Sequence, residues 1–191
     1  MLADFITSKS RIKLISVYLA NPFDMYHVRE LVRKTGDEIN AVRRELAFLE
    51  EHGILSKEKR ANRVYYFLNK AYPFYNDLLI LSTKTTGLGG DILKNRMKLG
   101  KLKYVMFSGK YIKHQKISPE EVDLLIVGTV VLPEIALLVR NEEARMGVEI
   151  NYTVMTEEEF DFRKSRNDPF IEGVLKGSRI TLIGDEEQML S

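Results

Sequence analysis

Two adjoining stretches, VRELVRKTG at residues 28–36 and INAVRRELAFLE at residues 39–50, decide the fold of the first part of the chain. Each has apolar residues at helical spacing, and the second repeats them at intervals of three, four and three. These apolar positions are Ile39, Val42, Leu46 and Leu49. Only a short turn at Gly36 separates the two predicted helices, so they must cross steeply, with the second presented outward.

The flanking residues complete a recognisable order of elements. SKSRIKLISVYLANP at residues 8–22 predicts a preceding helix, and a short extended piece follows it. The helix over INAVRRELAFLE is expected to begin after a capping acid, Asp37, and to stop at Gly53. GILSKEKRANRVYYFLN then predicts strands at 54–59 and 63–68 around a polar tip, Arg60-Ala61-Asn62. This order is typical of a winged helix-turn-helix domain.

The rest of the chain predicts a second kind of structure. A helical segment is expected over residues 71–103, interrupted by TGLGGD at 86–91, which we interpret as a hinge. After residue 104, apolar strand-like runs alternate with helical ones, which indicates a mixed or parallel sheet covered by helices. We therefore expect an α+β or α/β chain in three parts: a winged helix-turn-helix domain (1–70), a helical linker (71–103) and a small sheet domain (104–191).

Charge is unevenly distributed along the chain. Residues 1–118 contain 22 Lys and Arg against 11 Asp and Glu, whereas residues 119–191 contain 7 against 16. A basic first part suggests a polyanionic partner, although an electrostatic match between the two parts is the alternative. There is no cysteine, which excludes disulfides and thiolate chemistry. The charged first twenty residues and the lack of a long apolar run predict a cytoplasmic protein without a membrane segment.

The predicted outward helix and hairpin present side chains suited to duplex DNA. Arg can bind guanine or phosphate and Asn can bind adenine, and a basic hairpin can follow the phosphate backbone. The alternative is a solvated face in which the arginines pair with Glu38, Glu45, Glu50 or Glu51. The candidate DNA-binding residues are Thr35, Asn40, Arg43, Arg44, Lys57, Lys59, Arg60, Asn62 and Arg63.

Residues 8–69 resemble the amino-terminal domain of prokaryotic winged-helix transcriptional regulators of the ArsR/MarR-like type. The resemblance implies binding to double-stranded DNA as a homodimer at paired half-sites. The apolar stretch at residues 74–81 is a candidate dimer seam, with packing on its own domain as the alternative. More specifically, the chain resembles a group in which this domain precedes a nucleotidyltransferase-like domain.

The second resemblance rests on YVMFSGKYIKHQKISPEEVDLLIVG at residues 104–128. In minimal nucleotidyltransferase domains a strand ends in Gly-Ser and the next carries Asp-x-Asp, whose carboxylates hold divalent metal. Here the pattern departs at several points, with Gly-Ser reversed, the first acid lengthened and the third acid replaced by an amide. The residues at the motif positions are Ser108, Gly109, Glu121, Asp123 and Asn151.

These departures predict a site without catalysis, catalytic residues or resident metal. Loss of an anionic ligand weakens a magnesium site severely. A structural role is available for each acid: Ser118 and Glu121 have capping-box spacing, and Asp123 can accept bonds from backbone N–H groups. The scattered histidines His27, His52 and His114 show no metal-ligand spacing.

We therefore expect a sequence-specific DNA-binding transcriptional regulator. Its second domain would serve as a partner, dimerisation or ligand-sensing module. The first alternative is an active, magnesium-dependent nucleotidyltransferase of the antitoxin type that uses the winged helix for targeting. The second alternative is a protein–protein adaptor without affinity for duplex DNA.

Overall fold

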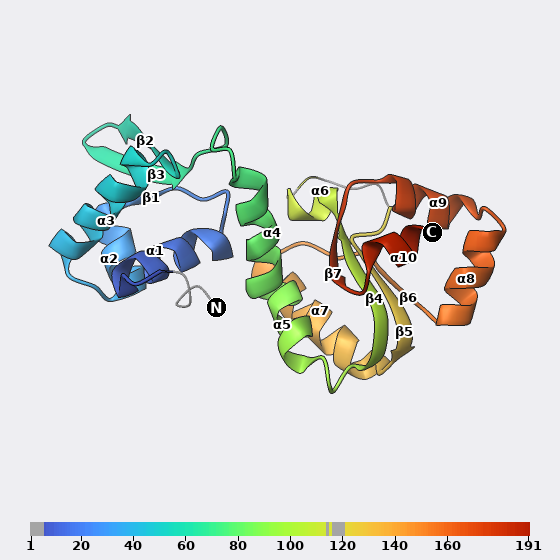
Figure 1. Ribbon diagram of the computed structural model, residues 1–191. Helices are drawn as coiled ribbons and strands as arrows, with labels where there is room; N and C mark the ends of the chain where they lie inside the picture. Colours follow the sequence, from blue (N-terminus) through green and yellow to red (C-terminus); the bar gives the residue numbers. More distant parts are fainter. Residues whose placement is uncertain (1–5, 114, 116–120) are drawn as a thin grey trace. The chain divides into compact units, whose positions relative to one another are not determined.

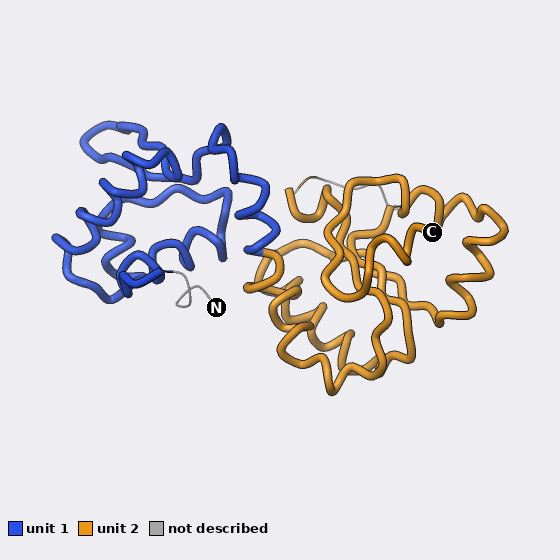
Figure 2. The backbone as a smooth tube through the Cα atoms, viewed as in Figure 1, with its two compact units in different colours: residues 1–82 blue, residues 83–191 orange. Residues whose placement is uncertain are grey.

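The computed structural model describes residues 6–113, 115 and 121–191, and Figure 1 shows its helices and strands. The chain divides into two compact units, residues 1–82 and residues 83–191, which Figure 2 colours separately. The boundary lies inside helix α4 (Tyr75–Thr85), so the segment predicted as a linker, 71–103, is shared between the units.

The first unit is a winged helix-turn-helix, as the sequence predicts. Its helices are α1 (Lys9–Ala20), α2 (Val28–Thr35) and α3 (Ile39–Glu51), followed by the beginning of α4. Its antiparallel sheet has the order β1-β3-β2, formed by β1 (Tyr26–His27), β2 (Leu55–Arg60) and β3 (Arg63–Leu68). The buried core consists of Leu14, Tyr18, Tyr26, Leu31, Val42, Leu46, Leu49, Leu55 and Leu68.

Two local expectations in this unit are wrong. Asp37 does not cap α3; the cap position is Glu38, which forms no side-chain cap bond, and Asp37 accepts a bond from Lys13 instead. The hairpin tip is also shorter than predicted. Arg60 pairs with Arg63 in the sheet, which leaves Ala61 and Asn62 as the turn. Gly36 adopts φ +68° at the end of α2, a backbone conformation that favours glycine.

The second unit contains a four-stranded mixed sheet of order β6-β5-β4-β7. The strands are β4 (Gly100–Ser108), β5 (Leu124–Val130), β6 (Tyr152–Met155) and β7 (Arg179–Ile183). Strand β4 pairs antiparallel with β5 and β7, and β5 pairs parallel with β6. The prediction of a mixed sheet is therefore confirmed.

Helices cover both faces of this sheet (Figure 1). One face packs on α8 (Glu157–Ser165), α9 (Pro169–Lys176) and α10 (Glu186–Leu190) through a core that includes Phe160, Ile171 and Met189. On the opposite face lie α5 (Gly87–Asn95) and α7 (Leu132–Met146). Burial on both faces explains why β5 is an almost continuous apolar run. A single helical turn, α6 (Gly109–Ile112), follows β4.

The interpretation of TGLGGD as a hinge is wrong, because its glycines lie inside α5. Gly89 is buried, and a Cβ there would lie 2.0 Å from the backbone oxygen of Thr83. Glycine is therefore required by close packing against the end of α4 rather than by flexibility. The predicted basic helix is also shortened, because α5 ends at Asn95 and the chain enters β4 at Gly100.

Candidate nucleic-acid interface

The outer face of α3 carries three polar side chains of the types that read base edges. Asn40, Arg43 and Arg44 are all exposed. None of the three forms a side-chain hydrogen bond or ion pair with another residue in the part of the chain that the structure describes. Of the glutamates in the alternative prediction, Glu45 is bonded to Arg11 and Glu50 to Lys57, and the charge of Arg44 also helps to lower the pKa of Glu45.

Glu45 fixes α3 on α1 from the opposite side. Its carboxylate is 4% exposed and accepts hydrogen bonds from Ser8 Oγ and Arg11 Nε, each at 2.8 Å. The Arg11 guanidinium also lies 3.5 Å from the centre of the Phe48 ring. Burial raises the pKa of Glu45, but the bonds from Arg11 and Ser8 outweigh it, so the pKa lies below its usual range. Sequence reasoning missed this role, although Glu45 stands three residues after the buried Val42.

Thr35 belongs to the turn rather than to the surface. It is 8% exposed, and its hydroxyl donates to Leu31 O at 2.8 Å while accepting from Asp37 N at 3.3 Å. Both bonds hold the chain where α2 ends and α3 begins. Thr35 therefore has a structural role in the helix-turn-helix, and DNA binding by Thr35 stays a prediction.

We call β2, β3 and their turn the wing, and two of its four cations are paired with acids. Lys57 Nζ donates to Glu50 of α3 at 3.0 Å, and Arg60 Nε donates to Glu58 at 2.9 Å. The ion pair with Arg60 lowers the pKa of Glu58, and the bond to Glu50 raises the pKa of Lys57. Lys59 has no such partner among the described residues. Exposed pairs of this kind are weak, so a phosphate can compete for the cations.

The wing cations are divided between its two faces. Side chains two residues apart in a strand share a face, so Lys57 and Lys59 lie on the side of the buried Leu55. Arg60 lies on the other face together with Arg63, its partner in the register. Two of the four cations predicted for the wing therefore lie on one face of the hairpin and two on the other. The exposed Asn62 lies at the tip.

The predicted nucleotidyltransferase residues meet at one end of the sheet in the second unit. Ser108 Oγ accepts from Tyr111 N and begins α6, and Ser108 N donates to Asp123 O at 2.8 Å. Gly109 N donates to Ser178 O at 2.6 Å. A Cβ on Gly109 would lie 2.0 Å from Ser178 Oγ, which explains the glycine. The reversed Ser-Gly order thus serves a strand-to-helix junction.

The two carboxylates of this cluster differ from their predicted arrangement. Strand β5 begins at Leu124, so Glu121 and Asp123 precede the strand instead of sharing one of its faces. Asp123 is 5% exposed, accepts from Asn151 N at 3.0 Å, and has a pKa raised mainly by burial. Glu121 accepts from Lys110 Nζ at 2.5 Å. The capping box predicted with Ser118 lies outside the described residues.

The donor set at this cluster does not fit magnesium as it is arranged. A hard cation requires several ionised oxygen ligands. Asp123 is buried and accepts a hydrogen bond from Asn151 N, Lys110 binds Glu121, and Asn151 supplies a neutral amide whose Nδ2 lies 3.4 Å from Glu121 O. In the described ranges, no group of three or more His, Asp or Glu side chains is arranged to hold a metal ion.

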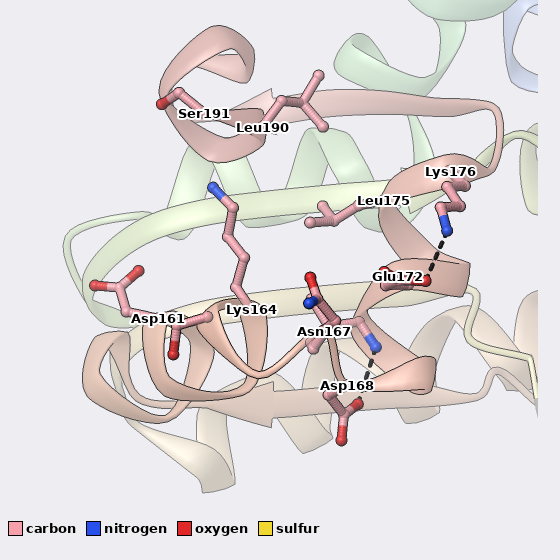
Figure 3. Close-up of a pocket in the computed structure, with 11 residues that line it drawn as sticks. Asp161, Lys164, Asn167, Asp168, Glu172, Leu175, Lys176, Leu190 and Ser191 are labelled. Atoms are coloured by element: carbon pink, nitrogen blue, oxygen red, sulfur yellow. Dashed lines mark hydrogen bonds and ion pairs between the residues drawn. The ribbon is translucent and has the colours of Figure 1, made fainter.

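Two cavities lie among the described residues of the second unit. One of about 250 Å³ borders the cluster and is lined by Ser108, Lys110, Glu121, Phe170 and Ser178, among others. The other, of about 590 Å³, is shown in Figure 3 and lies among α8, α9 and α10. Its acids Asp168 and Glu172 are engaged in capping α9 and in an ion pair with Lys176, respectively. Neither cavity includes a predicted DNA-binding residue.

Comparisons with known proteins give one partial similarity. No family model and no curated protein matches the chain. Among solved structures, reduced HlyU from Vibrio cholerae N16961 is similar to the amino-terminal region, at 23% identity. The match covers 42% of this chain and 83% of the HlyU chain, with a TM-score of 0.32. The winged helix-turn-helix assignment follows from the order of α1, β1, α2, α3, β2 and β3 and from the β1-β3-β2 sheet. No described helix is long and apolar enough to cross a membrane.

Proposed function

We propose that this chain is a transcriptional regulator that binds double-stranded DNA through α3 and the wing. The observation that carries the proposal is the unpaired state of Asn40, Arg43 and Arg44 on one exposed helix face. Side chains with this donor and acceptor capacity match base edges and phosphates. The buried bonds of Glu45 support it, because they fix the rotation of α3 and therefore the direction of that face.

In the proposed complex α3 enters the major groove and the wing contacts the backbone. Asn40 lies nearest the start of α3, the part of a recognition helix that reaches base edges in helix-turn-helix proteins. Arg43 and Arg44 bind guanine or phosphate, and Lys59 supplies a phosphate contact that needs no ion pair to be broken. Lys57 and Arg60 exchange their carboxylate partners for phosphates. Each phosphate contact makes binding more sensitive to salt.

We further propose that the regulator binds as a two-fold dimer. In the predicted seam, Phe74 is 59% exposed, whereas Tyr75 and Leu78 pack on the core of their own winged helix. Fewer side chains of residues 74–81 are therefore available for a dimer contact than the sequence indicates. A dimer would require half-sites about 10 base pairs apart, or a multiple of that distance.

The test is selection of bound duplexes from a random pool, followed by affinity measurements over a range of salt. We expect an enriched sequence with two related half-sites, and an affinity that falls linearly with salt on logarithmic axes. No enrichment, together with no duplex affinity at low salt, would contradict the proposal. That result would favour the protein–protein adaptor instead.

For the second unit we propose a partner or ligand-sensing role on an inherited nucleotidyltransferase-like sheet. The convergence of Ser108, Glu121 and Asp123 beside a cavity favours the alternative, an active nucleotidyltransferase. The poor fit of the donors to magnesium opposes it. Calorimetric titration with ATP and magnesium separates the two. Tight, metal-dependent binding that Asp123→Asn abolishes would establish the enzyme, and the proposed role predicts no such binding.

A further inference from the structure

His27 joins the helix-turn-helix to the wing. It is 9% exposed, ends β1 and occupies the cap position of α2. Its ring faces Glu30 of α2 on one side and Arg63 and Tyr65 of β3 on the other, with 5.6 Å between the His27 and Tyr65 ring centres. These three are the titratable and charged side chains in contact with the ring from the elements packed against it.

Each ring nitrogen of His27 faces an N–H donor. Nδ1 lies 3.2 Å from Glu30 N, and Nε2 lies 3.2 Å from Arg63 Nη1. A neutral imidazole carries one ring proton, so it can accept a hydrogen bond at only one nitrogen at a time. The Nδ1-protonated form accepts from Arg63 and directs its own N–H towards Glu30 Oε2, 3.8 Å away. The Nε2-protonated form caps α2 instead.

Protonation of the ring removes both acceptors. Imidazolium has a proton on each nitrogen, and its positive charge would face the Arg63 guanidinium at 3.2 Å. The guanidinium would then leave the ring.

We propose that neutral His27 is a positioning residue for Arg63 and that proton uptake releases Arg63. The inference rests on the proposed DNA-binding function. One of the five guanidinium N–H donors is held by His27, and the other four remain available to a backbone phosphate. Holding a long side chain in one orientation before binding reduces the entropy lost when the duplex binds.

A double-mutant cycle tests this role. Duplex affinity of the full chain is measured for wild type, His27→Asn, Arg63→Ala and the double variant, at pH 7.5 and pH 5.5. Asparagine is a good helix cap, so α2 is retained, but its shorter side chain does not reach Arg63. We expect a coupling factor of about threefold to tenfold at pH 7.5 and near one at pH 5.5. His52→Asn, at the exposed end of α3, is the matched control and should show no coupling with Arg63→Ala at either pH.

Several outcomes would overturn the inference. A coupling factor near one at pH 7.5 shows that His27 does not position Arg63. An equal factor well above one at both pH values shows that proton uptake does not release Arg63. Wild type that binds no duplex contradicts the proposed function, and with it the role in binding. In that case the NMR resonance of Arg63 Nε in the free protein still tests the contact. It should differ between wild type and His27→Asn at pH 7.5 and coincide at pH 5.5; identical spectra at pH 7.5 would exclude the contact.

Discussion

The outer face of α3 and the sheet-end cluster of the second unit both contain polar side chains, but, among the described residues, those of the cluster are bonded within the protein and those of α3 are not. The sheet-end cluster consists of Ser108, Gly109, Glu121, Asp123 and Asn151. On α3, Asn40, Arg43 and Arg44 have no side-chain partner among the described residues. In the cluster, Lys110 is bound to Glu121, and Asp123 accepts from the backbone of Asn151. Polar groups already satisfied within the protein stabilise the fold, whereas unpaired groups on a fixed surface can bind a partner at little cost. This difference supports the proposal that α3, and not the cluster, binds a partner.

The largest expected effect is on duplex affinity. Replacing both Arg43 and Arg44 by alanine removes two unpaired cations from α3, and we expect affinity to fall by about tenfold to a hundredfold. Fluorescence anisotropy at constant salt measures the change. The matched control is Lys101→Ala with Arg140→Ala, which removes the same charge from exposed positions of the second unit. Equal losses for the two double variants would show that only net charge matters.

A second prediction concerns the fixation of α3. Glu45→Gln removes the charge of a buried carboxylate that accepts from Ser8 and Arg11, so the free energy of unfolding should fall by about 1–3 kcal/mol at pH 7. Because the pKa of Glu45 is lowered, its stabilisation is present above the usual glutamate range and is lost as pH falls through the lowered value.

Urea unfolding at pH 7 and at acidic pH measures both effects of this substitution. The difference between wild type and Glu45→Gln should narrow as the solution becomes acidic. The exposed Glu51→Gln, on the same helix, serves as the control and should leave stability nearly unchanged. Equal stability of the two variants would mean that α3 is held by its apolar core alone.

Asp123 gives an opposite pH dependence. Burial raises its pKa, so the folded protein binds that proton more tightly than the unfolded chain does, and stability decreases as pH rises through the usual Asp range. Asp123→Asn keeps an oxygen for Asn151 N–H and removes the buried charge. At pH 7 the variant should be more stable than wild type, by an amount on the order of 1 kcal/mol, and the gain should vanish at low pH.

Equilibrium unfolding at pH 7 and pH 3 tests this prediction, with the exposed Asp161→Asn as the control. A loss of stability at pH 7 would indicate that the charge of Asp123 is needed. Asp123 would then not be a group whose burial costs stability, and the contrast drawn between the cluster and α3 would not hold for this residue.

The smallest expected effect distinguishes two lysines on one face of the wing. Lys57 must leave Glu50 before it can bind a phosphate, whereas Lys59 has no described partner. Lys59→Ala should therefore reduce duplex affinity about twofold to fourfold more than Lys57→Ala. Each substitution should also reduce the salt dependence by about one phosphate contact. An equal loss for both lysines would show that the Glu50 pair does not compete with DNA.

Helical and strand periodicity predicts most of the fold because it reports which side chains face a core. The 39–49 repeat locates α3, and the long apolar run locates β5. The glycines of α5 mislead because local composition does not show that Gly89 packs against the backbone of Thr83. Helix α9 was missed, although the sequence contains a signal for it: Asp168 and Pro169 mark a helix start, and apolar residues follow at 170, 171, 174 and 175.

Some features of the candidate site can also be predicted from the sequence, and others cannot. Exposure of Asn40, Arg43 and Arg44 follows from their position opposite the apolar stripe, so the sequence is sufficient. Ser8 and Arg11, which bind Glu45, and Arg63, which contacts His27, are 34 to 37 residues away from those side chains in the chain. Contacts of that range depend on how helices and strands pack, and no local pattern encodes them. The sequence analysis did not predict the ion pairs of Lys57 with Glu50 and of Arg60 with Glu58. The second could have been predicted, because residues 58 and 60 share one face of a strand.

The most direct measurement follows two side-chain amides of the same kind, Asn40 on α3 and Asn151 in the sheet-end cluster, by NMR as the selected duplex is added to the full chain. We predict that the Nδ2 resonances of Asn40 shift in proportion to the bound fraction while those of Asn151 stay in place. A shift at Asn151 with none at Asn40 would contradict this prediction.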